Sequence, residues 1–240
     1  MKKVVTLALL ALFITGCASD DAVKSAAQAD FDTAKKKLEK GHYGEVALTL
    51  QDFTTKHPYS KYATQAELLR LFAAYKGGEF ILSEVLSKDF VERHPRHPDV
   101  DYAKYMLAMS HYRQSSPSER DQEQTIGAIK GFKRLLKEHP ESSYAKDGAN
   151  RLQRLYKRLA GHELNVGKFY FDKGRYVAAA NRFQVILEKY QTTDAIEEGL
   201  YWLAASFDRL GITENARQTA IILKHTYPNS DWSRKAARFL

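Results

Sequence analysis

Apolar residues recur along most of this chain at spacings of three, four and seven residues, the pattern of amphipathic helices. The pattern itself repeats, because a stretch that opens at Gly41 and closes at Pro58 is followed by a similar stretch from Gly78 to Pro95. The glycine and the proline are 17 residues apart in both stretches, and the two prolines are 37 apart. Such a period is typical of helical repeat proteins, in which each repeat is a pair of helices.

Three further copies follow the same plan. They span 123–140, 174–191 and 211–228, with Glu123 in place of the glycine of the third copy and Gln191 in place of the proline of the fourth. Small and apolar residues occupy matching positions in the five copies: Val46, Leu50 and Phe53; Ser83, Ser87 and Phe90; Ala128, Phe132 and Leu135; Ala179, Phe183 and Ile186; Ala216, Ala220 and Leu223. Five copies predict five repeats.

Each position in the repeat has a physical reason. Glycine adopts the left-handed conformation that ends the first helix of a pair, small residues allow the helices to cross closely, and proline ends the second helix. A candidate N-cap residue follows each stop: Ser60, Asp99, Ser142, Thr193 or Asp194, and Ser230. The first helices are therefore expected at about 22–40, 61–76, 100–113, 144–173 in one or two pieces, and 195–210.

The repeat predicts an all-α fold, a right-handed superhelical array of about five tetratricopeptide (TPR) helix-turn-helix repeats. Two spacings are longer than the rest. The third closing position lies 45 residues after the second because of a polar loop at 113–124, and the fourth lies 51 residues after the third because of a long amphipathic segment. We expect N-terminal repeats 1–3 over 30–140, and a long connecting helix with repeats 4–5 over 141–240.

The first sixteen residues form a separate segment, in which Lys2 and Lys3 precede an apolar run of eleven residues that leads to Cys17. Eleven helical residues cover roughly 16 Å, about half of a ~30 Å hydrocarbon core. The run therefore predicts a cleaved signal peptide at 1–16 instead of a membrane span. The four residues Ile14-Thr15-Gly16-Cys17 are similar to the lipobox of bacterial lipoproteins.

That resemblance implies that Cys17 carries a covalent lipid, a diacylglycerol and an N-acyl chain, at the start of a lipidated linker over 17–29. Cys17 is the only cysteine, so no disulfide can form within the chain. Ala18 and Ser19 follow it without an aspartate, which resembles lipoproteins of the Gram-negative outer membrane and implies a location on its periplasmic face. The alternative is that the signal peptide is cut elsewhere and Cys17 carries no lipid.

The net charge of +8 and the pI near 9.3 raise the question of a nucleic-acid partner. Export removes most such partners, and the basic residues are spread through the helices together with acidic ones instead of clustering. We therefore expect no nucleic-acid partner. The charge is interpreted as a solvated helical surface that favours acidic proteins or anionic lipid.

Catalytic chemistry has little support in the sequence. His94 and His97, followed by Asp99 and Asp101, have the composition of a metal site. A histidine precedes the closing proline in three repeats, however, which favours a structural role: His57, His94 and His139. The only cysteine is assigned to lipid and no serine lies in a glycine elbow, so we expect no catalytic residue, no metal, no cofactor other than the lipid, and no enzymatic activity.

Binding is the remaining candidate function, because arrays of this kind hold extended peptides in a groove lined by the first helices of the pairs. Aromatic and basic residues of the N-terminal repeats are the candidate client-binding positions: Tyr59, Tyr62, Arg70, Tyr75, Tyr102, Lys104 and Tyr105. We expect most of the aromatic ones in the core. Those that face the groove would bind apolar client side chains, and Lys61, Arg70 and Lys104 would pair with a terminal carboxylate.

Four stretches carry a family resemblance over nearly the whole chain: the lipobox at Cys17 and the segments 97–106, 140–152 and 166–182. The Asp-Tyr-Ala-Lys-Tyr-Met motif in the second stretch and the Ala-Asn-Arg motif in the fourth are more specific than a general TPR pattern. On these residues the chain resembles the BamD family, the TPR lipoproteins of the β-barrel assembly machinery (BAM complex) in the Gram-negative outer membrane.

The resemblance implies a non-enzymatic assembly factor for outer-membrane β-barrels. The N-terminal repeats would bind the C-terminal signal of unfolded outer-membrane proteins, and the C-terminal repeats would dock on a POTRA domain of the barrel-forming subunit, with other assembly lipoproteins as further partners. Arg182 would form a salt bridge to that subunit, and pairing of Arg182 within its own repeat is an equally open alternative. The rival function is an envelope TPR lipoprotein that acts as an adaptor for peptidoglycan enzymes.

Overall fold

The computed structural model describes residues 20–115 and 123–240. The chain divides into two compact units, residues 1–78 and residues 79–240. Three predicted features lie outside the described residues: the signal peptide at 1–16, Cys17, and the middle of the loop at 113–124.

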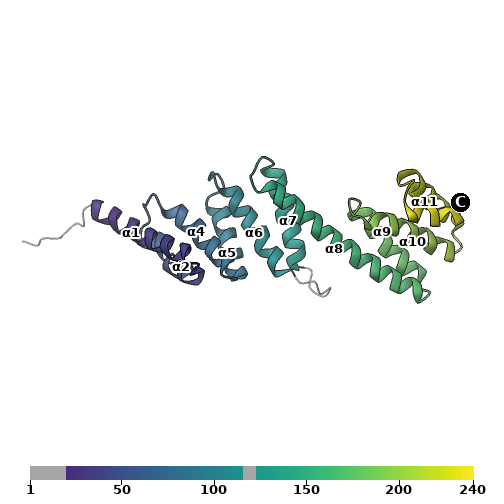
Figure 1. Ribbon diagram of the computed structural model, residues 1–240, viewed down its shortest axis with the longest axis horizontal. Coiled ribbons are helices and arrows are strands. Elements are labelled where there is room, and N and C mark those ends of the chain that lie inside the picture. Colours follow the sequence, from purple (N-terminus) through teal and green to yellow (C-terminus); the bar gives the residue numbers. More distant parts are fainter. Residues whose placement is uncertain (1–19, 116–122) are drawn as a thin grey trace, which may run out of the picture. The chain divides into compact units, whose positions relative to one another are not determined.

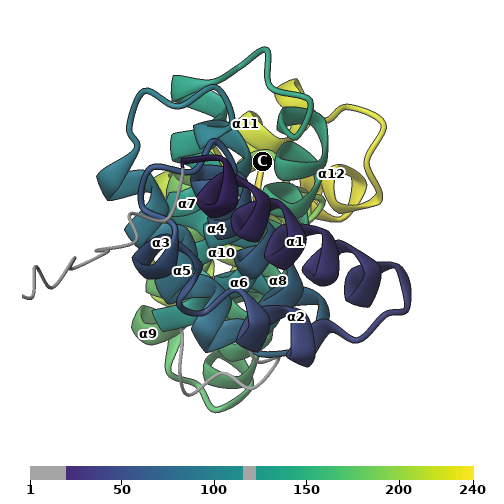
Figure 2. The ribbon, with the colours of Figure 1, turned by 90° about the vertical axis from the view of Figure 1, so that its left-hand side faces the viewer.

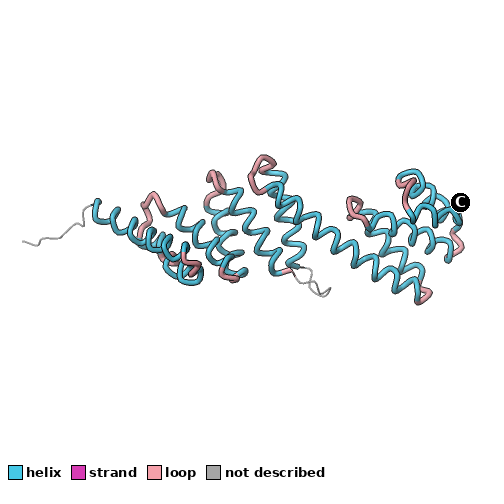
Figure 3. The backbone as a smooth tube through the Cα atoms, viewed as in Figure 1, coloured by secondary structure: helices cyan, strands magenta, loops and turns pink. Residues whose placement is uncertain are grey.

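Every regular element in the described ranges is a helix, and no strand occurs in them (Figure 3). The described part of the first unit contains α1 (Asp20–Glu39), α2 (Tyr43–Thr49), α3 (Phe53–Lys56) and α4 (Ala63–Lys76). That of the second contains α5 (Phe80–Arg93), α6 (Val100–Gln114), α7 (Glu123–Glu138), α8 (Ala145–Asp172), α9 (Tyr176–Lys189), α10 (Ala195–Arg209), α11 (Thr213–Thr226), α12 (Asp231–Ala236) and the 3-10 helix η1 (Ala237–Phe239). None of these helices combines the length and the hydropathy that a membrane span requires.

Within each unit the helices follow one another as hairpins (Figure 1), so the fold is the helical TPR array that the repeat predicts. Four corners form at the expected glycines: Gly41, Gly78, Gly174 and Gly211 have φ angles of 75°, 85°, 72° and 75°. Residues that carry a Cβ atom are strained in this left-handed region, and glycine is not. The predicted bounds of the first helices are confirmed to within about two residues, and α8 is one continuous helix of 28 residues.

Each second helix buries three side chains on one face, at positions 12, 8 and 5 residues before its closing residue. We call these positions the core slots. They are filled by Val46, Leu50 and Phe53; Ser83, Ser87 and Phe90; Ala128, Phe132 and Leu135; Ala179, Phe183 and Ile186; and Ala216, Ala220 and Leu223, each at most 3% exposed. Spacings of four and three place the slots on one helical stripe, and each large apolar side chain stabilises the fold by roughly 1.5–3 kcal/mol.

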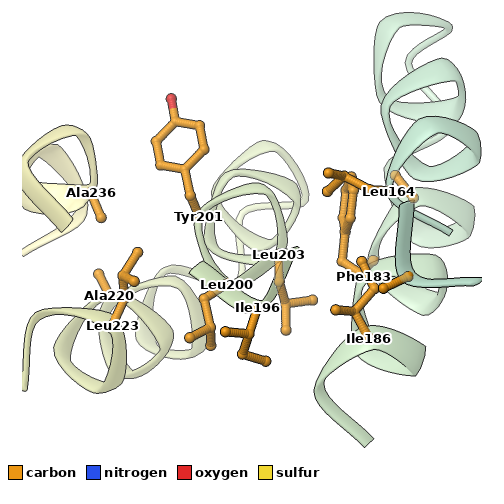
Figure 4. Close-up of a cluster of buried hydrophobic side chains, with 13 residues drawn as sticks. Leu164, Phe183, Ile186, Ile196, Leu200, Tyr201, Leu203, Ala220, Leu223 and Ala236 are labelled. Carbon is orange, nitrogen blue, oxygen red and sulfur yellow. The ribbon is translucent and has the colours of Figure 1, made fainter. Parts of the chain in front are cut away.

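The cluster in the last repeats shows how core slots join neighbouring helices. Phe183 and Ile186 of α9 face the side of α10 that carries Ile196 and Leu203 (Figure 4). On its other side α10 packs against α11, whose Leu223 belongs to the same apolar cluster. The first helix α10 therefore completes the core of the pair before it as well as that of its own pair, and a single pair would leave an apolar face exposed.

In the first unit, α1 packs against α2 (Figure 2). Residues 20–29, which we predict as part of a linker over 17–29, instead form the first half of α1. The reason is burial: Ala27 is 2% exposed and belongs to the same apolar cluster as Phe31 and Val46. The helix therefore has to begin before residue 27 to bring this small side chain into the core.

The boundary between the units at Gly78 also differs from the expected one between 140 and 141. The long helix α8 packs against α7 at one end and against α9 and α10 further along. It therefore joins repeats 3 to 5 within the second unit instead of separating two groups of repeats. The long spacing in the sequence reflects added helical turns in α8 and not a linker.

The predicted N-caps are confirmed at Ser230, whose hydroxyl accepts a hydrogen bond from the backbone N–H of Trp232. Ser60 and Ser142 accept the same bond from the residue two positions later, at 3.2 Å in both cases. Asp99 and Asp194 are the N-cap residues of α6 and α10, as predicted, but their side chains make no capping hydrogen bond. The hydroxyl of Thr193 donates to a preceding carbonyl instead of accepting from the helix.

The second helix of repeat 1 is broken into α2 and α3, which the sequence analysis does not predict. At the end of α2, Thr49 donates its hydroxyl to the carbonyl of Glu45 at 2.7 Å, but Ser110 makes the same contact with Met106 inside the unbroken α6, so this bond alone does not explain the break. Helical geometry resumes at Phe53, whose ring has to reach its core slot.

Gly174→Ala should lower the free energy of unfolding by about 1 kcal/mol, because alanine is strained at a positive φ. Gly161→Ala is the matched control, since Gly161 lies inside α8 with open space around the added methyl group. It should raise the stability by up to about 1 kcal/mol. Urea denaturation of both variants checks this, and equal effects of the same sign would contradict the assigned corner.

Candidate functional site

A recurring contact ties the end of a second helix to the first helix of the same repeat. Nε2 of His57 donates to the carboxylate of Asp30 at 2.8 Å, across 27 residues. In repeat 3, Nε2 of His139 accepts from the ammonium of Lys104 at 2.7 Å, across 35 residues. The second contact spans eight residues more than the first, and repeat 3 is also eight residues longer than the 37-residue period. The two contacts are therefore equivalent in their repeats.

Repeat 4 has a tyrosine at this position. Tyr190 lies 27 residues after Glu163, and burial, followed by the nearby charge of Glu163, raises the pKa of its hydroxyl. The expectation that the histidines before the closing prolines have a structural role is therefore confirmed for His57 and His139. Each of these side chains connects the end of a second helix to the first helix of its own repeat.

His94 and His97 also pack as structural residues. Both rings contact Phe90, and their centroids are 6.3 Å apart. Nδ1 of His97 accepts a hydrogen bond from the backbone N–H of Asp99 at 3.1 Å, so this nitrogen already has a partner. Within residues 20–115 and 123–240, no three histidine, cysteine or carboxylate side chains gather as they do around a metal ion.

Two candidate tyrosines of the first unit lie close in sequence and differ in exposure. Tyr59 is fully exposed. Tyr62 stacks on Phe31 with ring centroids 5.0 Å apart and donates its hydroxyl to Gln28 of α1. Tyr62 therefore has a packing role, whereas the ring of Tyr59 is available to a ligand. A third candidate, Tyr75, is partly buried near the end of α4.

Arg70 is the candidate cation of the first unit. Its Nη1 lies 3.5 Å from the carbonyl oxygen of Gln51, at the break between α2 and α3. Its Nε is buried and has no hydrogen-bond partner among the described residues. Partial burial lowers the pKa of the guanidinium, against the opposite effect of Asp52. A partly desolvated guanidinium suits a carboxylate ligand, which would have to approach its other nitrogens because the Nε–H is buried.

The candidate tyrosines of the second unit form a cluster with Tyr144. The rings of Tyr105 and Tyr144 stack with centroids 4.9 Å apart, and Tyr102 lies 5.2 Å from Tyr144. The hydroxyl of Tyr105 donates to Asp147 at 2.6 Å. Burial and then this carboxylate raise the pKa of Tyr105 to about 12, and burial also raises the pKa of Tyr102.

The cluster continues along α8 through residues that the sequence analysis does not single out. Asp147 accepts hydrogen bonds from Tyr105 and from Nε of Arg151. The guanidinium of Arg151 lies 5.2 Å from the ring centre of Tyr112 on α6. Asp147 and Arg151 lie four residues apart on α8, which the sequence shows. Their partners on α6 are about 40 residues away, so the sequence does not show these contacts.

Lys104 is buried and paired. It is 9% exposed, and its ammonium lies 2.7 Å from both the carboxylate of Glu138 and the ring of His139. Glu138 also accepts from Arg134 at 2.9 Å. The hydrogen bond from Lys104, followed by that from Arg134, holds the pKa of Glu138 below its usual value. The charge of Lys104 is thus satisfied within repeat 3.

Arg182 on α9 has a partner within its own repeat. Its Nη1 donates to the carboxylate of Glu163 on α8 at 3.2 Å. The side chain of Arg182 is 43% exposed and that of Glu163 is 14% exposed. The guanidinium therefore keeps donors that face solvent while one of its edges is held by α8.

The model of the YfiO family, described as "Outer membrane lipoprotein", matches residues 24–223. The chain belongs to this family. A relative from Rickettsia prowazekii is 30% identical over 203 residues, which are 85% of this chain and 81% of the relative. A relative from Neisseria meningitidis serogroup A is 29% identical over 248 residues, which are 96% of this chain and 93% of the relative. Both are named "Outer membrane protein assembly factor BamD".

Among solved structures, the yeast Sti1 structure titled "TPR2AB-domain:pHSP90-complex" aligns with 88% of this chain and 81% of its own, at 15% identity and a TM-score of 0.44.

Lys104→Met should raise the pKa of Glu138 towards its ordinary value and lower the stability at neutral pH by about 1 kcal/mol, a value discounted for the exposure of Glu138. Because the folded-state pKa of Glu138 is depressed, its contribution is present above the ordinary carboxyl pKa of about 4.3 and is lost as the pH falls through the folded-state pKa. Carboxyl NMR titration and urea denaturation check both effects. Lys88→Met, on exposed surface, is the control, and an unchanged titration of Glu138 would contradict the assigned pairing.

Proposed function

We propose that this chain is an outer membrane protein assembly factor, a lipid-anchored scaffold of the BAM complex that binds unfolded β-barrel clients and docks on the barrel-forming subunit. The observation that carries the proposal is membership of the YfiO family together with relatives of that name that match over more than four-fifths of both chains. The TPR array supports it, because such arrays act by holding other polypeptides.

Client binding is assigned first to the N-terminal repeats. Tyr59 offers a fully exposed aromatic ring, and Arg70 offers a partly desolvated guanidinium. Aromatic and arginine side chains of this kind dominate the energetics of protein recognition. Lys104 is less suited to a client carboxylate because Glu138 and His139 already surround its ammonium. Tyr62, Tyr75, Tyr102 and Tyr105 would then support the surface by packing.

Docking on a POTRA domain of the barrel-forming subunit is assigned to the C-terminal repeats, with Arg182 as the candidate contact. The half-exposed guanidinium favours this role, because it can pair with a second carboxylate while Glu163 orients it. Other assembly lipoproteins are further partners, and no nucleic-acid partner is proposed. The scaffold acts by binding alone, without catalytic residues, metal or cofactor.

The anchor is a diacylglycerol and an N-acyl chain on Cys17, after removal of the signal peptide at 1–16. It would hold the chain to the periplasmic face of the outer membrane. Several acyl chains, at about 0.8 kcal/mol for each buried methylene, make such attachment almost irreversible.

Arg182→Glu should reduce co-purification of the barrel-forming subunit from detergent-solubilised envelopes by at least about tenfold, since it places a negative charge where the proposal has a cation. The matched control is Glu163→Gln, which removes the internal partner of Arg182 and leaves its charge. It should retain most of the subunit. Equal losses in the two variants would assign Arg182 to the internal pair alone.

A photoreactive amino acid at Tyr59 in intact envelopes should crosslink to unfolded outer-membrane polypeptides. The same probe at Glu92, on the exposed side of α5, is the control and should give few adducts. Adducts at Tyr59 with cell-wall hydrolases or synthases, and with no outer-membrane protein, would overturn the assembly function in favour of an adaptor for peptidoglycan enzymes.

A further inference from the structure

The second helices share four outward positions, 7, 10, 11 and 14 residues after the corner position of each repeat. We call them the outer slots. They are Leu48, Gln51, Asp52 and Thr55; Val85, Lys88, Asp89 and Glu92; Lys130, Lys133, Arg134 and Lys137; Asn181, Gln184, Val185 and Glu188; and Gln218, Ile221, Ile222 and His225. All are exposed except Val185, which is half-buried. The repeats can therefore be compared position by position on surface that the fold leaves free.

Helix α7 differs from the others at these slots. All four of its residues are basic: Lys130, Lys133, Arg134 and Lys137. The slots of α5 hold one lysine against two acidic residues, those of repeat 1 and of α9 hold one acidic residue each, and those of α11 hold no lysine, arginine or acid. The other repeats are exposed at these slots without such a charge, so the charge on α7 is not needed for solubility. We call Lys130, Lys133, Arg134 and Lys137 the basic face.

Most of the charge of the chain gathers around this helix. Between residues 130 and 158, nine basic residues stand against three acidic ones, so this segment carries +6 of the net charge of +8. The remaining residues hold 28 basic and 26 acidic side chains. The expectation of evenly spread charge is wrong for α7 and the first half of α8.

The basic face is poorly neutralised by its own chain. Arg134 shares Glu138 with Lys104, and the ammonium of Lys133 lies 5.5 Å from the ring centre of Tyr156. Lys130 and Lys137 form no ion pair within the described residues. Ile126, four residues before Lys130 on the same stripe, is 44% exposed. The face therefore combines unpaired ammonium groups with an apolar side chain at one end.

We propose that the basic face of α7 binds the surface of a membrane that contains anionic phospholipid. Three of its four cations are lysines, whose hydrated point charges suit the diffuse charge of many headgroups, whereas a defined carboxylate favours the planar fork of arginine. The exposed Ile126 fits the interfacial region beside the headgroups. This inference rests on the proposed function, because the lipid on Cys17 would bring the chain to the membrane.

The test uses the full lipid-bearing chain in vesicles of phosphatidylcholine alone, or of phosphatidylcholine with a third of phosphatidylglycerol. A water-soluble acylating reagent labels the lysines, and mass spectrometry gives the labelling rate at each. Labelling of Lys130, Lys133 and Lys137 should be at least about threefold slower in the anionic vesicles. Molar salt, which shortens the Debye length to about 3 Å, should restore it. Lys88 occupies the same slot as Lys133 on α5, and its rate should not change.

Two variants of equal charge change sharpen the result. Arg134→Gln should weaken the protection of Lys133 and Lys137, whereas Gln184→Glu on α9 should leave it unchanged. Equal rates in the two kinds of vesicle, or equal protection of Lys88, would overturn the inference while leaving the assembly function intact. Protection that appears in neutral vesicles only after other envelope proteins are added would assign the face to a protein and overturn it too. A chain that fails to float with either vesicle would instead remove the tether on which the inference rests.

Discussion

Burial of the core slots is the constraint on which the rest of this structure depends. Each second helix buries its three slots against neighbouring helices of its own unit, and none of the short helices would be stable alone in water. The fifteen side chains differ in size, from Ser87 to Phe183, yet all are buried. The sizes are distributed differently in each repeat: Phe90 stands beside Ser87 in α5, whereas Phe132 stands beside Leu135 in α7. Packing is thus adjusted repeat by repeat while the backbone plan stays fixed.

Because the core uses one face of each second helix, the opposite face is free to carry function. The repeats exploit this freedom differently. Helix α7 carries the basic face and α9 presents Arg182, whereas in the first unit the exposed Tyr59 follows α3 and the partly desolvated Arg70 lies on the first helix α4. Lys104 differs from these residues, because its ammonium is buried between two helices, where it pairs with Glu138 and His139 and stabilises the fold. The surfaces are therefore separable, and each can change without loss of the array.

The hairpin plan was predictable because it depends on local chemistry. Gly41 and Gly174 mark corners where the backbone needs a positive φ, and the closing prolines mark helix ends. The partners of Lys104 were not predictable, since they lie 34 and 35 residues away in the sequence, on the next helix and just after it. The basic face becomes visible in the sequence only when equivalent outer slots of the five repeats are compared. The distribution of charge along the whole chain does not reveal it. The break between α2 and α3 has no signal in the repeat, because the same core slots are filled across it as in the unbroken second helices.

Native-state hydrogen exchange of the full chain tests the central claim most directly. If the core slots hold the array together, the amides around Phe90, Leu135, Ile186 and Leu223 will be the slowest to exchange, and those at the glycine corners will exchange fast. Uniformly fast exchange through the second helices, or slow exchange confined to α8, would contradict the account, because the array would then depend on its long helix and not on repeated burial.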